Sequence, residues 1–106
     1  MKPARDYYED LLRDLRNPEE AAAYLNAALE AGDQKAFLMA LRNVLAARLG
    51  MTKAARKTKM NRVSLYKMLS PDGNPGFENI LRLLRSVGIC FRVTPEDWGK
   101  DRKKAA

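Results

Sequence analysis

Apolar positions along the first half of the chain recur at the spacing of amphipathic helices. A first stripe, with steps of three and four residues, consists of Tyr8, Leu11, Leu12 and Leu15. Stripes of the same period follow over residues 22–29 and 37–49. Because this period brings apolar side chains to one face of a helix, three helices are predicted before Gly50.

The residues between these stripes are typical of helix boundaries. Asn17, directly before Pro18, and Asp33 have side chains that can accept hydrogen bonds from a first helical turn. Gly32 and Gly50 follow the second and third stripes, where a helix often ends on a glycine. The predicted helices are therefore separated by short connections.

The second half of the chain predicts three shorter helices. Thr52 and Asn61 are N-cap candidates for two of them, which extend to about Thr58 and Leu69. A loop rich in glycine and proline, residues 70–76, precedes the last helix. The apolar positions of that helix are Phe77, Ile80, Leu81, Leu84 and Val87. The fold class is therefore mainly all-α, with five to six helices.

The apolar period changes at the segment Ile89–Val93. Ile89, Phe91 and Val93 alternate with Cys90 and Arg92, which is typical of a short β-strand. It is the one strand candidate in the sequence, so its backbone groups need a partner. Either the same strand of a second copy pairs with it in a homodimer, or the segment is an extended tail that lies on the helices.

The formal net charge of +7 is unevenly distributed. Residues 1–33 carry four basic and eight acidic side chains, whereas residues 34–71 carry nine basic side chains and no acidic one. Residues 72–106 carry seven basic and five acidic side chains. A basic segment of this length favours a polyanionic partner, and the alternative is a solvated basic face.

The composition excludes several classes of chemistry. With one cysteine and no histidine, the chain cannot form an internal disulfide, a zinc site of the usual nitrogen and sulfur ligands, or a histidine-based catalytic group. Ser64 and Lys67 have the Ser-x-x-Lys spacing of penicillin-binding enzymes, but the companion Ser-Asp-Asn and Lys-Thr-Gly elements are absent. We therefore expect no enzyme activity, no cofactor and no metal.

The sequence also argues against a membrane protein. No apolar run approaches the ~20 residues of a membrane-spanning helix, and the N-terminus has no apolar core of a signal peptide. The basic segment has few aromatic residues with which to stack single-stranded RNA bases or to enter a lipid surface. A cytoplasmic protein that binds double-stranded DNA is the expectation that remains.

Residues 51–70 contain two short predicted helices and a tight turn. Ala55 is small where the two helices cross, and Leu65 is an apolar residue of the second helix that faces the core. This spacing resembles the helix-turn-helix of Xre/Cro-type repressors, whose second helix enters the major groove. Lys59 stands where the motif usually has glycine, because the chain there tends to adopt a positive φ. A residue other than glycine in that conformation costs roughly 1 kcal/mol of stability. A helical core without a DNA role is the alternative.

The second helix of this motif would present its candidate DNA contacts on one exposed face. Arg62 can donate two hydrogen bonds to guanine, and Val63 can contact a thymine methyl group. Lys67 is a phosphate or guanine contact. Tyr66 can pack on a sugar or bond a phosphate, and the alternative for it is partial packing in the core.

Further candidates lie at the starts of the two helices. Asn61 is first a helix cap and second a DNA contact. Thr52 and Lys53 begin the preceding helix, where backbone N–H groups and the lysine charge suit a phosphate. Arg56 and Lys57 add positive potential close by.

Several blocks of the sequence together resemble the HigA-like family of addiction-module antidotes. The resemblance covers residues 18–93 and depends on Tyr24-Leu25-Asn26, on residues 64–71 and on residues 73–77. It implies an antitoxin that represses its own operon and neutralises a small basic RelE/ParE-like toxin. A stand-alone Xre/Cro-type regulator without a toxin is the alternative, and the neighbouring gene would distinguish the two.

Three regions follow from these patterns. Residues 1–32 are predicted to be an acidic helical extension, compatible with docking a basic partner or with a solvated face. Residues 33–94 form the helix-turn-helix domain with its terminal strand, and residues 95–106 form a flexible charged tail.

Overall fold

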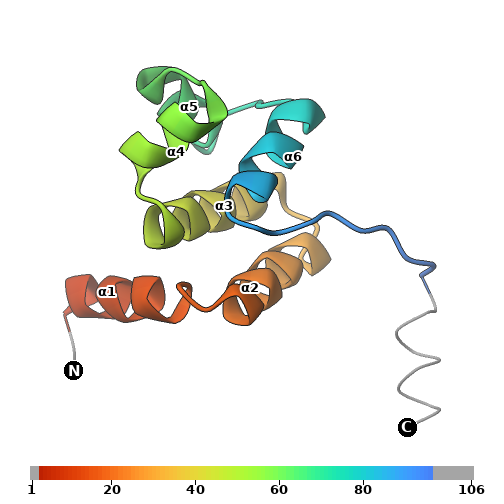
Figure 1. Cartoon of the computed structure of the whole chain (residues 1–106). Coiled ribbons are helices and arrows are strands. Elements are labelled where there is room, and N and C mark those ends of the chain that lie inside the picture. The colour runs from red at the N-terminus through yellow and green to blue at the C-terminus, as the bar shows by residue number, and fades with distance from the viewer. Residues whose placement is uncertain (1–2, 97–106) are drawn as a thin grey trace, which may run out of the picture.

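The computed structural model describes residues 3–96, which form six α-helices and no strand (Figure 1). The helices, in chain order, are α1 (Ala4–Asp14), α2 (Pro18–Glu30), α3 (Gln34–Arg48), α4 (Met51–Thr58), α5 (Arg62–Met68) and α6 (Phe77–Ser86). The prediction of a mainly helical chain with five to six helices is therefore confirmed. Within the described residues, no helix is both long and apolar enough to cross a membrane.

Short polar side chains cap three of the helices where the sequence predicts them. The Asn17 side chain accepts from the backbone N–H groups of Glu19 and Glu20 at 2.8 and 3.2 Å. Asp33 accepts from the N–H of Lys35 at 3.0 Å. Each cap satisfies backbone donors that have no acceptor within their own helix, which fixes where that helix begins.

The prediction that Thr52 caps α4 is wrong. The helix begins one residue earlier, at Met51, and its N-cap position is Gly50 with φ 82° and no side-chain hydrogen bond. Because Gly50 can adopt this positive φ without a steric penalty, the chain turns directly from α3 into α4. Thr52 is therefore the second residue of the helix.

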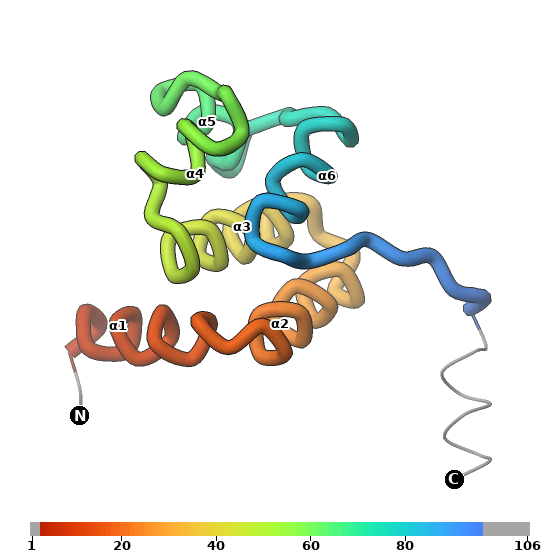
Figure 2. The backbone as a smooth tube through the Cα atoms, in the orientation of Figure 1, coloured from red at the N-terminus to blue at the C-terminus, as the bar shows by residue number. Residues whose placement is uncertain are grey.

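Helix α3 lies at the centre of the molecule. It packs against α1 and α2 on one side and against α4 on the other, while α4 also packs against α5 and α6 (Figure 2). The largest side chains that are fully buried between these helices are Leu15, Leu38, Leu41, Val44, Leu45, Leu65, Leu69 and Leu83. Removing such a leucine side chain typically costs 2–5 kcal/mol, so this core holds the helices in fixed positions.

The core crosses the boundary predicted at residue 32. Ala21 and Leu25 of α2 are buried in the same cluster as the leucines of α3. Arg48 links the two parts as well, because its side chain donates to the carbonyl oxygen of Arg16 at 2.7 Å and to that of Val87 at 3.2 Å. The division into regions stays a prediction, and most of the predicted tail, from residue 97 onward, lies outside the described residues.

The β-strand predicted at Ile89–Val93 is not seen in the structure of the single chain. Residues 3–96 offer no second extended segment with which it could pair, and pairing with a second copy stays a prediction. Ile89 packs instead against the core, and the Phe91 ring meets the Phe77 ring edge-on at 5.5 Å between centroids. The second alternative, an extended tail on the helices, therefore holds for Ile89 and Phe91, and beyond them the chain runs away from the helices (Figure 2).

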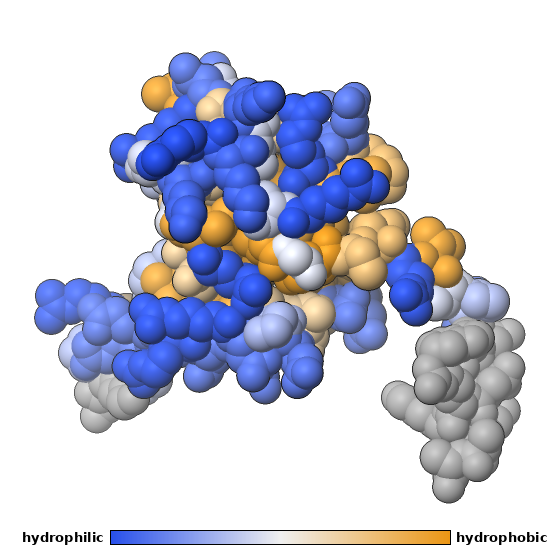
Figure 3. Space-filling model, viewed as in Figure 1, coloured by the Kyte–Doolittle hydropathy of each residue, from blue (hydrophilic) through white to orange (hydrophobic). Residues whose placement is uncertain are grey.

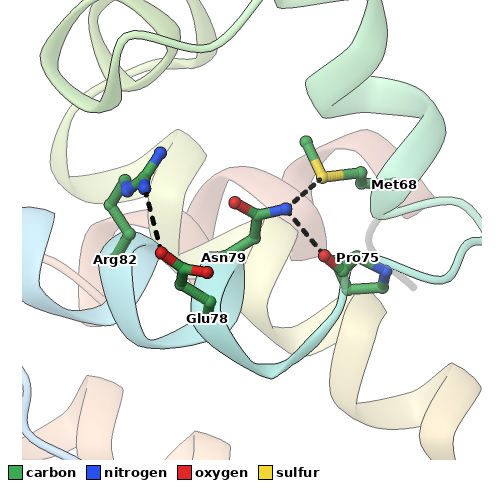
Figure 4. A network of polar contacts seen from close by, with 5 residues as sticks. All are labelled: Met68, Pro75, Glu78, Asn79 and Arg82. Carbon is green, nitrogen blue, oxygen red and sulfur yellow. Dashed lines mark hydrogen bonds and ion pairs between the residues drawn. The ribbon is translucent and has the colours of Figure 1, made fainter.

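The loop between α5 and α6 is held close to both helices. Asn79 of α6 donates to the carbonyl oxygen of Pro75 at 2.7 Å and to the sulfur of Met68 at 3.7 Å (Figure 4). Gly73 approaches α5 so closely that a Cβ atom there would lie 1.9 Å from the carbonyl oxygen of Met68. A residue without a side chain is therefore required at position 73.

Candidate nucleic-acid interface

Helices α4 and α5 are joined by a three-residue turn. The two helices and this turn, residues 51–68, are called the α4–α5 unit below. Lys59 begins the turn in the left-handed region, at φ 59° and ψ 37°, and it is the one non-glycine residue with a positive φ among residues 3–96. The N–H of Met60 donates to the carbonyl oxygen of Ala55 at 2.9 Å, the bond that closes a Schellman-type helix end. The positive φ predicted for this turn is confirmed.

The inner face of the α4–α5 unit is apolar and fully packed. Ala54, Ala55 and Leu65 are at most 4% exposed, and Leu69, directly after α5, is 2% exposed. Met60 packs partly against the same cluster. Because these side chains fix how α5 rotates about its axis, they also determine which of its residues face solvent.

The outer face of α5 carries three of the predicted contact residues. Arg62, Val63 and Lys67 are all exposed, and Val63 is 74% exposed although it is apolar. Asn61 orients the start of the helix, because its side chain accepts from the N–H groups of Val63 and Ser64 at 2.8 and 3.2 Å. The predicted capping role of Asn61 is confirmed, and the contacts of the other residues with DNA stay a prediction.

Tyr66 differs from its neighbours, because it is half-buried and its ring packs partly against the core. Two guanidinium groups lie over the ring. The central carbon of Arg62 is 5.6 Å from the ring centroid, and that of Arg42, from α3, is 5.0 Å from it. At these distances a cation is attracted to the face of an aromatic ring, so Tyr66 holds two positive charges near the start of α5.

Thr52 and Lys53 lie on the exposed side of the first turn of α4. N–H groups of a first helical turn lack acceptors within the helix, and the N-cap Gly50 provides no side-chain acceptor. No acidic residue is present in this turn. The first turn of α4 therefore combines backbone donors with the charge of Lys53, a combination that suits a phosphate.

The exposed basic residues of the α4–α5 unit and Arg42 beside it form one surface, and its positive charge is not neutralised within the described chain. Ion pairs of residues 3–96 join Arg13 to Asp10 at 3.3 Å and Arg82 to Glu78 at 3.6 Å, and neither includes a residue of the acid-free segment 34–71. Figure 3 shows hydrophilic side chains gathered over α4 and α5. The exposed cations of this surface are Arg42, Lys53, Arg56, Lys59, Arg62 and Lys67.

Two basic residues have roles that differ from those the sequence indicates. The Nζ atom of Lys57 donates to the carbonyl oxygen of Ser86 at 2.9 Å, so this side chain stabilises the end of α6. Arg42 joins the surface from α3, 24 residues before Tyr66. Its membership in the acid-free segment was the only signal for it, because the motif of residues 51–70 does not include α3.

Residues 8–95 match the model of a family described as "Probable addiction module antidote protein". An uncharacterized protein of Haemophilus influenzae is 33% identical over 84 residues, which are 79% of this chain and 86% of that protein. No solved structure matches the chain.

Proposed function

Because the chain belongs to the family of probable addiction module antidote proteins, we propose that it is the antitoxin of a type II toxin–antitoxin module. In this proposal it neutralises a toxin and represses its own operon by binding operator DNA. The α4–α5 unit is the Xre/Cro-type helix-turn-helix that reads the DNA, in a HigA-like organisation. The protein acts in the cytoplasm.

The observation that carries the DNA-binding part is the outer face of α5. It combines exposed cations with an apolar residue that is 74% exposed, in a segment of 38 residues without a carboxylate. Burying Val63 would gain more than leaving it in water, and a thymine methyl group in the major groove is a partner of suitable chemistry.

The geometry supports different roles for the two helices: α5 would contact bases, and α4 would contact the DNA backbone. Arg62 and Val63 are in the first turn of α5, the part of a recognition helix that contacts base edges. Thr52 and Lys53 at the start of α4 are placed to bind the DNA backbone and so to fix the register. Lys67, one turn farther along α5, is a second cation for bases or phosphates.

The toxin partner that we propose is a small basic protein of the RelE/ParE-like superfamily. Support comes from the family description and from the acidic N-terminal third, where residues 1–33 carry twice as many acidic as basic side chains. Tyr7 and Tyr8 on α1 are 55% and 45% exposed. Opposite charge and exposed aromatic rings are features of a protein-binding face.

We further propose that two copies bind a two-fold symmetric operator, since most helix-turn-helix proteins bind as dimers with one half-site per subunit. Light scattering tests this part, and a monomer at high concentration contradicts it.

We propose no catalytic role for the chain. Ser64 has the spacing of a catalytic serine relative to Lys67, and its backbone N–H donates to the side chain of Asn61 at 3.2 Å in the cap of α5.

Co-expression with the neighbouring reading frame tests the antitoxin role. The proposal predicts that this frame encodes a basic protein of about 100 residues whose expression stops growth. This chain should restore growth and co-purify with that protein. If the neighbouring product is harmless and does not bind the chain, while the chain still binds its own upstream DNA, the protein is a stand-alone regulator.

A further inference from the structure

We propose that Arg42 of α3 binds a phosphate of the DNA backbone, and that Tyr66 positions Arg42 and Arg62 for DNA without contacting DNA itself. This inference depends on the proposed DNA-binding function. It extends the interface to a helix outside the α4–α5 unit. It also changes the role of Tyr66 from a direct contact to a positioning residue.

The geometry of the three side chains is the basis for the proposal. Both guanidinium groups lie over one ring, with central carbons at 5.0 Å (Arg42) and 5.6 Å (Arg62) from its centroid. The ring itself is half-buried against the core, whereas both arginines are exposed. Tyr66 is therefore the fixed part of the cluster, and it restricts two long side chains that would otherwise sample many rotamers.

The cluster has no internal counter-charge. No residue of 34–71 is acidic, and within residues 3–96 neither arginine has a carboxylate partner. Two positive groups over one ring repel each other, which reduces the stabilisation that the ring provides. An anion bound beside them removes the repulsion and gains charge-assisted hydrogen bonds, so the arrangement favours a phosphate ligand.

The position of Arg42 favours the DNA backbone over a base. Arg62 is the first residue of α5 and would be inserted with that helix into the major groove. Arg42 reaches the same ring from the middle of α3, a helix that lies beside the α4–α5 unit and not within it. A side chain that approaches a recognition helix from its flank meets the phosphates at the groove edge, which carry no sequence information.

Fluorescence anisotropy with the duplex directly upstream of the chain's own coding sequence tests the proposal. Variants Arg42→Ala, Tyr66→Phe and Tyr66→Leu are compared with Arg13→Ala, the matched control. Arg13 is an exposed arginine on α1, and its loss changes the net charge equally. A thermal melt of each variant confirms that it is folded before binding is compared.

We expect Arg42→Ala to weaken binding roughly tenfold relative to Arg13→Ala. Its plot of log affinity against log salt should become shallower by about 0.9, and its ranking of operator variants should not change. Tyr66→Phe should bind like the original chain, because a phenyl ring still holds both guanidinium groups. Tyr66→Leu should weaken binding at least as much as Arg42→Ala and, because Arg62 loses its support as well, should also discriminate less among operator variants.

Distinct outcomes would contradict distinct parts of the account. Equal binding by Arg42→Ala and Arg13→Ala, with tight binding by the original chain, overturns the role of Arg42 alone. Tyr66→Phe as weak as Tyr66→Leu shows that the hydroxyl group contacts DNA, and this overturns the positioning role. No binding by the original chain overturns the proposed DNA-binding function, and this inference with it.

Discussion

Lys57 of α4 donates from its Nζ atom to the carbonyl oxygen of Ser86, the last residue of α6, at 2.9 Å. The last carbonyl groups of a helix have no intrahelical donor and carry the negative end of the helix dipole. Lys57, like Arg48, therefore stabilises the fold. The exposed cations on α4 and α5, such as Lys53 and Lys67, form no ion pair within residues 3–96. Measurements of stability distinguish cations that support the fold from cations that are exposed for binding.

Replacing Lys57 by methionine should lower the free energy of unfolding by about 1 kcal/mol, because the terminal carbonyl group of α6 loses a charged donor. Methionine keeps most of the apolar stem, so packing changes little. Urea denaturation measures the effect. Lys53→Met is the matched control on the same helix, and it should leave stability unchanged. Equal stability of the two variants would contradict the role assigned to Lys57.

Replacing Lys59 by glycine should stabilise the protein by about 1 kcal/mol. The residue has φ 59° and ψ 37°, a conformation in which a Cβ atom is strained and glycine is not. Lys59→Ala is the control, because it removes the charge and keeps the Cβ atom. Thermal melting of the three proteins should rank glycine above lysine and alanine. A glycine variant less stable than the alanine variant would show that the turn is not strained.

Replacing Gly73 by alanine should destabilise the fold by at least about 2 kcal/mol. The new Cβ atom would lie 1.9 Å from the carbonyl oxygen of Met68 and 2.8 Å from that of Lys67, and both are backbone atoms that cannot rotate away. Gly76→Ala is the comparison, because a Cβ atom there meets nothing within 4 Å and only its φ of 80° is unfavourable. Denaturation midpoints measure both variants. An equal loss of stability in the two would argue against the close approach of Gly73 to α5.

Arg62→Ala and Lys53→Ala should weaken DNA binding in different ways. Loss of a base contact at Arg62 should reduce the free energy of DNA binding by roughly 1–3 kcal/mol and relax discrimination among operator variants. Loss of Lys53 should weaken all sequences alike and make the salt dependence shallower. Competition binding with a panel of single-base operator variants distinguishes the two. An unchanged order of preference for Arg62→Ala would remove that residue from base recognition.

The helix boundaries and caps could be predicted because their causes are local. Asn17, Asp33 and Asn61 each accept from N–H groups two or three residues away, so the sequence pattern contains all the information. The positive φ of Lys59 was predictable for the same reason. Thr52 was a wrong cap prediction because Gly50, which can adopt a positive φ, takes the N-cap position and α4 begins at Met51.

Features that depend on distant segments could not be read from the sequence. The alternation of Ile89, Phe91 and Val93 satisfies the pattern of a strand, but residues 3–96 offer no second strand to pair with. Ile89 packs on the core and Phe91 meets the ring of Phe77, whereas Val93 is 85% exposed. The approach of Arg42 to Tyr66 and the bond of Lys57 to Ser86 span 24 and 29 residues. Such contacts depend on how α3 lies against α5 and α4 against α6, which local spacing does not specify.

The central claim is that the α4–α5 surface binds the operator of the chain's own operon. Its most direct test is anisotropy of the duplex upstream of the coding sequence, measured against a scrambled duplex and over a range of salt. The account predicts clear preference for the upstream duplex and an affinity that falls by roughly a hundredfold or more between about 50 and 200 mM salt. Equal binding to both duplexes, or an affinity independent of salt, would contradict it.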